Sequence, residues 1–190
     1  MASLTDVVQA LTAGDPQGGW LRRMFEQLEE VHWGALRRPG TITAGPVQRE
    51  VPLVDGVVTL PCVVETDTLL LALEDARTSP LATGTDADPK RHRVSRVIEA
   101  LRVLARTRAE TAGLDIDPLF GVIVIGGSEI PEPHRTTILE GLPHIEREQA
   151  EDLYANYWGR LAPDEFEALR TVSPPAGATP RPRPGETPQP

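Results

Sequence analysis

The sequence predicts an α/β or α+β fold, a mixed sheet of about three to five strands with helices on both faces. Three observations support this. β-favouring residues between 51 and 64 surround Asp55-Gly56, a hairpin turn signal. Residues 120–125 form an unbroken apolar run, typical of an inner strand covered on both faces. Residues 91–112 carry one apolar stripe at helical spacing, which predicts a long helix packed on the sheet.

Length and composition indicate one globular domain over residues 1–172, followed by a tail over residues 173–190. The tail contains seven prolines and almost no apolar residues. Such a segment buries too little surface to offset its ordering entropy, so we expect it to be disordered. A hydrophobic content of 39% and a charged content of 25% are ordinary for a soluble protein.

The chain lacks the features of membrane and secreted proteins. No apolar run approaches the roughly 18–20 residues needed to span a bilayer, and no basic region precedes an apolar core at the N-terminus. The single cysteine, Cys62, excludes an internal disulfide and a multi-cysteine zinc site. We therefore expect a cytoplasmic protein of bacterial type without a membrane partner.

The N-terminal part predicts two helices. Residues 4–11 have apolar side chains at helical spacing, with Ser3 or Thr5 as the cap. After a glycine-rich break at 14–19, a second helix begins near Trp20 and presents an apolar face that we expect to be core. It is followed by the strand region, where Pro52 and Pro61 indicate sheet edges or bulges.

A buried central strand is predicted over residues 68–73, and a polar loop over 78–89. The long helix follows, and Gly113 is expected to end it. Beyond the strand at 120–125, helices are predicted at 134–141, 146–160 and 163–170. The helix at 153–161 would carry Tyr154, Tyr157 and Trp158, which would form a protein-interaction patch if they were exposed.

The charge is distributed unevenly. The net charge is −9, but residues 89–108 hold seven basic side chains against Glu99 alone, a segment charge of +6. The basic residues expected on nucleic acid are Lys90, Arg91, Arg93, Arg102 and Arg106. Such a helix face binds a phosphate backbone without sequence preference. The alternative is a solvated face that pairs with acids, since the rest of the chain carries −15.

The central strand ends on two carboxylates and a guanidinium, Glu74-Asp75-Ala76-Arg77. Two converging carboxylates hold Mg²⁺ through hard oxygen ligands, and the metal stabilises charge on a phosphate in transfer. Candidates for the additional carboxylate are Asp55, Glu50, Glu65 and Asp67.

This acid-x-base strand end, with the order helix, antiparallel strands, helix, strand, helix, resembles the PD-(D/E)xK nuclease-like fold over about residues 20–127. The resemblance implies Mg²⁺ held by Glu74, Asp75 and Asp55, with Asp75 and Arg77 as the catalytic pair. A contribution from the second helix, by Glu26, Glu29 or Glu30, would match the helical acid that the family occasionally uses. Arg77 departs from the lysine of the family pattern, and its permanent, delocalised charge is less suited to activating water. No other cofactor is expected.

Two functions follow from these patterns. The first is a nuclease-like domain that contacts DNA or RNA, either with metal-dependent phosphodiester hydrolysis or as an inactive relative. The second is a non-enzymatic protein-interaction or scaffold domain, which contacts a protein through the basic helix or the 153–161 aromatic helix. They differ in one geometric respect: in the second, Arg77 and the helix arginines pair with acids.

Overall fold

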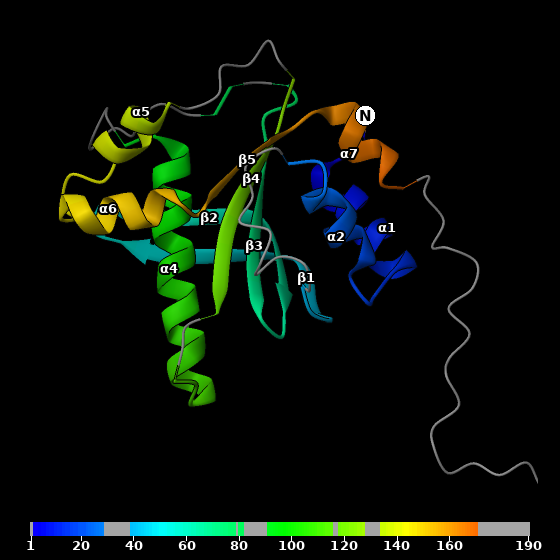
Figure 1. Cartoon of the computed structure of the whole chain (residues 1–190), viewed down its shortest axis with the longest axis horizontal. Helices are drawn as coiled ribbons and strands as arrows, with labels where there is room; N and C mark the ends of the chain where they lie inside the picture. Colours follow the sequence, from blue (N-terminus) through cyan, green and yellow to red (C-terminus); the bar gives the residue numbers. More distant parts are fainter. Residues whose placement is uncertain are drawn as a thin grey trace, which may run out of the picture.

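The computed structural model describes residues 2–28, 39–78, 80–81, 91–115, 118–127 and 134–170. Within them the chain forms a mixed sheet of five strands in the order β1-β2-β3-β4-β5. Helices cover both faces of this sheet (Figure 1). The predicted α/β architecture is therefore confirmed. The predicted tail at 173–190, Lys90, Glu29 and Glu30 lie outside the described residues.

Two helices come first. α1 is Leu4–Gly14, and its N-cap Ser3 accepts a hydrogen bond from the amide of Asp6 while the Asp6 carboxylate accepts from the amide of Ser3. This reciprocal capping satisfies two amides that the helix itself leaves unpaired. α2 is Gly19–Phe25, with Trp20, Leu21, Met24 and Phe25 buried.

The next elements form an antiparallel meander of β1 (Ile42–Leu53), β2 (Gly56–Thr66) and β3 (Leu69–Asp75). β1 is an edge strand, and Pro61 of β2 lies where the β1–β2 register shifts between Val47 and Arg49. The predicted edge and bulge positions of the prolines are thus confirmed. Beyond this shift the two strands form a hairpin arm, residues 48–61, that lies against α4.

α4 is Arg93–Ala112, and it ends at Gly113, whose φ of 63° is the left-handed conformation expected of a C-terminal glycine. β4 (Leu119–Ile125) follows and runs parallel to β3. α5 (Arg135–Glu140) and α6 (Arg147–Tyr154) then lead to β5 (Tyr157–Leu161), which is parallel to β4, and α7 (Pro163–Ala168) closes the described fold.

One predicted element is wrong. Residues 157–161 form β5, so the aromatic helix at 153–161 does not exist as a single helix. Gly159 has a φ of 109°, which a helix does not allow, and Tyr157 pairs with Val122 of β4. Trp158 is buried, and its ring lies edge-on to Phe25 with centroids 5.7 Å apart. The Leu153–Tyr157–Leu161 spacing therefore matched a helical stripe by coincidence.

Two hydrophobic layers result from the alternation of side chains along the strands. Leu69, Leu71 and Leu73 of β3 pack with α1, α2 and α7, while Leu70 and Ala72 pack with α4, α5 and α6. Figure 1 shows α4 on one side of the sheet and α1, α2 and α7 on the other. Charged residues that are neighbours at a strand end therefore lie on opposite faces of the sheet, beside different hydrophobic layers.

Candidate functional site

The two carboxylates at the end of β3 point to opposite faces of the sheet. Glu74 lies on the α4 face, where both of its oxygens accept hydrogen bonds from Arg93, at 2.8 Å each. Asp75 lies on the other face and accepts from Nε and Nη2 of Arg77 at 2.9 and 2.7 Å. Neighbouring strand residues alternate in direction, so Glu74 and Asp75 do not converge on a common point.

Asp55, the third predicted metal ligand, lies in the β1–β2 turn and binds two further arginines. Its oxygens lie 3.1 Å from Nε of Arg91 and 3.1 Å from Nε of Arg96. The three predicted ligands therefore belong to three separate ion pairs. Among the residues that the structure describes, no group of three or more histidine, cysteine, aspartate or glutamate side chains is placed to hold a metal ion.

The ion pairs set the protonation of these acids. The hydrogen bond from Arg77 lowers the pKa of Asp75, although partial burial opposes it. Burial acts to raise the pKa of Asp55, but the hydrogen bond and charge of Arg91 outweigh it, and the pKa is lowered. Burial raises the pKa of Glu74, against the hydrogen bond and charge of Arg93. Asp55 and Asp75 are thus held as ion-paired carboxylates.

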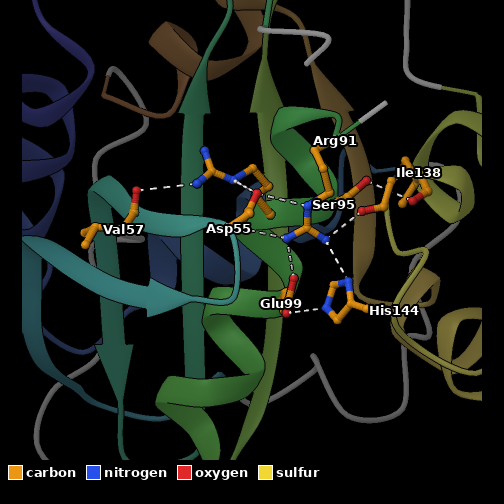
Figure 2. Close-up of polar contacts among 9 residues, drawn as sticks. Asp55, Val57, Arg91, Ser95, Glu99, Ile138 and His144 are labelled. Atoms are coloured by element: carbon orange, nitrogen blue, oxygen red, sulfur yellow. Dashed lines mark hydrogen bonds and ion pairs between the residues drawn. The ribbon is translucent and has the colours of Figure 1, made fainter. Parts of the chain in front are cut away.

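The largest polar assembly surrounds Arg91 and is shown in Figure 2. We call it the Arg91 network: Asp55, Arg91, Arg96, Glu99 and His144. The Arg91 side chain is 2% exposed and donates to Asp55, to Glu99 at 2.7 Å and to the carbonyl of Gly141 at 2.8 Å. His144 lies 2.8 Å from Glu99 through Nε2 and 3.4 Å from Arg91 through Nδ1.

This network joins three parts of the fold. Asp55 comes from the hairpin turn, Glu99 and Arg96 from α4, and His144 from the segment between α5 and α6. A second bond, from the Ser95 hydroxyl to the carbonyl of Ile138 at 2.8 Å, fixes the same segment to α4. A buried charge is stable only when it is paired and hydrogen-bonded, and Arg91 is both. The network therefore holds the hairpin arm and the α5–α6 segment against α4.

The arrangement offers no activated nucleophile in the part of the chain described. The Ser95 hydroxyl is buried and donates to a carbonyl rather than to a base. Both ring nitrogens of His144 already have partners, so this imidazole has no free nitrogen with which to take a proton from a substrate. The chemistry of the site is ion pairing.

The other described arginines of the basic segment differ in how far they are engaged within the chain. Arg93 binds Glu74 and also donates to the carbonyl of Thr59 at 2.6 Å. Arg106 pairs with Glu110 on the exposed side of α4, at 3.0 Å. Arg108 donates to the carbonyl of Thr66. Arg102 is half-buried.

Sequence reasoning missed Glu99 and His144 as members of the site. Glu99 was visible as the one acid within the basic segment 89–108, which is a signal that an arginine of the same segment needs a partner. His144 carried no comparable signal, because its partners lie 45 and 53 positions earlier in the chain.

Within the part of the chain that the structure describes, one face of the hairpin arm is exposed. Val51 and Val58 point towards α4 and are buried, whereas Val57 on the opposite side is 60% exposed and Val54 in the turn is 78% exposed. We call six exposed side chains between residues 50 and 61 of the arm the open face: Glu50, Pro52, Val54, Val57, Thr59 and Pro61.

Two hollows lie elsewhere in the described structure. One, of about 430 Å³, is lined by residues around α2 and the β2–β3 turn, including Arg22, Arg23 and Asp67. The other, of about 290 Å³, lies between α5 and α6 and is lined by Leu139, Pro143 and their neighbours. The first hollow contains Asp67, one of the candidates for the additional carboxylate, and the second contains no residue that the sequence predicted to be functional.

No protein-family model, curated protein or solved structure matches this chain. Within the described helices, none combines the length and the apolar composition that a bilayer-crossing helix requires.

Proposed function

We propose that this chain is a non-enzymatic protein-interaction domain whose contact surface is the open face of the hairpin arm. The partner is a protein surface or extended peptide with apolar side chains beside a basic residue. The observation that carries the proposal is the pairing of the arginines: Arg77 with Asp75, Arg93 with Glu74, and Arg91 and Arg96 with Asp55. A guanidinium held by a carboxylate within its own fold is not available to a phosphate.

Charge supports the choice of partner. Because the arginines near the start of α4 are neutralised by acids of the same fold, the net charge of −9 belongs to the rest of the chain. A polyanion is repelled by such a surface, whereas a basic partner is attracted to it. On the open face itself, the one charged member is Glu50, which pairs across the strands with Thr59.

The geometry of the arm supports the choice of the open face as the contact surface. Pro52 and Val57 are direct cross-strand neighbours, and together with Val54 and Pro61 they form an apolar patch. The arm is held from behind: Arg96 donates to the carbonyl of Val57 at 3.5 Å, and Asp55 is fixed by the Arg91 network. A prearranged patch binds with less loss of conformational entropy than a mobile one.

The second candidate is a PD-(D/E)xK nuclease-like domain that has lost cleavage. The order of elements from α2 to β4, with β3 ending on Asp75-Ala76-Arg77, favours it. It differs from the first proposal in requiring that α4 bind DNA or RNA.

One experiment separates the two. Labelled DNA and RNA, single- and double-stranded, are titrated with the intact chain at about 50 mM salt, where phosphate contacts are strong. The same protein is used to select from a displayed library of random peptides. We expect no shift of nucleic-acid anisotropy, and enrichment of peptides that combine apolar residues with arginine or lysine.

Matched variants make the result specific. Val57→Glu places a charge on the open face and should abolish peptide enrichment. Val103→Glu changes another exposed valine, on α4, and should leave enrichment intact. Salt-dependent binding of DNA or RNA that Arg102→Glu and Arg106→Glu remove would overturn the proposal, as would peptide enrichment that survives in Val57→Glu.

A further inference from the structure

The N-cap of α4 is a histidine, which makes this helix terminus sensitive to protons. Nδ1 of His92 accepts a hydrogen bond from the backbone amide of Val94 at 3.1 Å, and the residue is 6% exposed. A backbone amide only donates, so Nδ1 must be the unprotonated nitrogen of a neutral imidazole. An imidazolium has a hydrogen on both nitrogens and cannot cap the helix.

Among the described residues, the charged groups next to His92 do not stabilise its protonated form. Arg91 and Arg93 flank it in the chain, and they are bound to acids from three elements: Asp55 of the hairpin, Glu99 of α4 and Glu74 of β3. From the α5–α6 segment, His144 faces Arg91 and Glu99.

Three influences act on the His92 imidazole in the same direction. Burial lowers the pKa of His92 below its ordinary value. The helix N-terminus adds positive potential at the same place, and protonation would remove the capping acceptor. A Cβ at Gly141 would lie 3.2 Å from the His92 amide nitrogen, so the α5–α6 segment packs against the backbone at the start of α4.

His92 is covalently next to Arg91, the centre of the network that holds the hairpin arm. The Arg91 guanidinium reaches Asp55 in the turn and the carbonyl of Gly141, and Figure 2 shows it between these two parts of the fold. The first turn of α4 therefore fixes the backbone from which Arg91 reaches the hairpin. Loss of that turn would move Arg91 away from Asp55.

We propose that His92 is a proton-operated catch on the hairpin arm. A proton from solvent converts the imidazole into an imidazolium, the hydrogen bond from the Val94 amide is lost, the first turn of α4 opens, and Asp55 is released from Arg91. No covalent bond other than the N–H bond to the added proton is formed or broken. The catch belongs to the fold itself, so it does not depend on the identity of any partner.

The direction of the pH dependence follows from the lowered pKa. The opened state binds the proton with the ordinary pKa of about 6.5, and the closed state with a lower one. Closing is therefore most favourable above about pH 6.5, and this preference is lost as pH falls towards the lowered pKa. Within that window the opening equilibrium rises by up to about tenfold per pH unit, the limit for one proton. Glu74, whose pKa is raised, contributes the opposite dependence.

The test is amide hydrogen exchange of the intact chain between about pH 7.5 and pH 5, corrected for the intrinsic exchange rate. We expect faster opening at lower pH in the first turn of α4 and, in parallel, at Val57 and Val58 of the hairpin arm. His92→Asn supplies a good N-cap that does not titrate, and it should remove this pH dependence from both segments. His144→Gln and His134→Asn should retain it.

Each alternative outcome is informative. Opening that is independent of pH in the unaltered protein would refute the catch. So would a pH dependence that survives in His92→Asn but disappears in His144→Gln, or one confined to α4 that leaves the hairpin amides unchanged. Should His92→Asn fail to fold, a proton NMR titration of the His92 ring in the unaltered protein decides. A ring that titrates at or above the ordinary histidine value contradicts the proposal.

Discussion

Replacing Arg93 by methionine tests whether the Glu74–Arg93 pair stabilises the fold. Glu74 is 4% exposed, and the Arg93 side chain is 18% exposed. The substitution keeps an apolar stem of similar length but removes both hydrogen bonds to Glu74 and the one to the Thr59 carbonyl. It therefore leaves a buried carboxylate without its partner.

The magnitude follows from the cost of an unpaired buried charge. Breaking a buried pair by removing one partner destabilises a protein by about 3–5 kcal/mol. Because Arg93 is partly exposed, we expect the lower end, about 3 kcal/mol, at neutral pH. This corresponds to a fall in Tm of about 6–12 °C for a chain of this size. The assay is urea unfolding followed by circular dichroism.

The same variant has a defined pH dependence. The pKa of Glu74 is already raised by burial, and loss of the opposing Arg93 interactions raises it further. A carboxyl with a raised folded-state pKa stabilises the fold below its unfolded value of about 4.3, and that contribution is lost as pH rises through the folded pKa. The destabilisation of Arg93→Met relative to the unaltered protein should therefore shrink on acidification, as Glu74 becomes neutral.

Two control variants determine which results would refute the prediction for Arg93→Met. Arg106→Met breaks an exposed pair, with side chains 72% and 66% exposed, and should change stability by less than about 1 kcal/mol. The double variant with Glu74→Gln removes the charge as well and should recover part of the loss. If Arg93→Met costs no more than Arg106→Met, or if its effect does not diminish with acid, the pair does not stabilise the fold as argued.

Three further predictions concern backbone, packing and thiol chemistry. Gly113→Ala places a side chain at φ 63° and should destabilise the protein by about 1 kcal/mol, whereas Gly14→Ala, in α1 and with open space around it, should be neutral or stabilising; urea unfolding compares them. Gly121→Ala would put a Cβ within 2.2 Å of the Trp158 ring, and we expect a loss of about 1–3 kcal/mol with a changed tryptophan emission spectrum. Burial raises the pKa of Cys62 to about 12, so its reaction with a disulfide reagent near pH 8 should follow unfolding, and rapid labelling of the folded protein would contradict this.

Much of the fold is local and was predictable from the sequence. The Ser3 cap, the end of α4 at Gly113 and the hairpin turn at Asp55-Gly56 depend on side chains a few positions apart, and the structure confirms each. The apolar run 120–125 correctly indicated a strand buried on both faces. The opposed directions of Glu74 and Asp75 were also implied, because adjacent strand residues alternate.

Other features depend on long-range contacts, which no local pattern encodes. Residues 157–161 form β5 because they pair with the edge of β4, although the spacing of their apolar side chains also suited a helix. The sequence did not show whether the arginines at the start of α4 face solvent or acids. That depended on partners from other parts of the fold, namely Asp55, Glu74 and the α5–α6 segment.

By itself, the sequence determined the kinds and the order of the elements other than β5, because backbone preference and hydrophobic period act over one or two turns. Tertiary structure decided which charges meet. A carboxylate and a guanidinium attract whatever their separation along the chain, so only the packing of the sheet against α4 could assign Asp55 to Arg91 and Glu74 to Arg93. Arg91 and Arg93, which the sequence placed on a cationic binding face, therefore form ion pairs inside the fold.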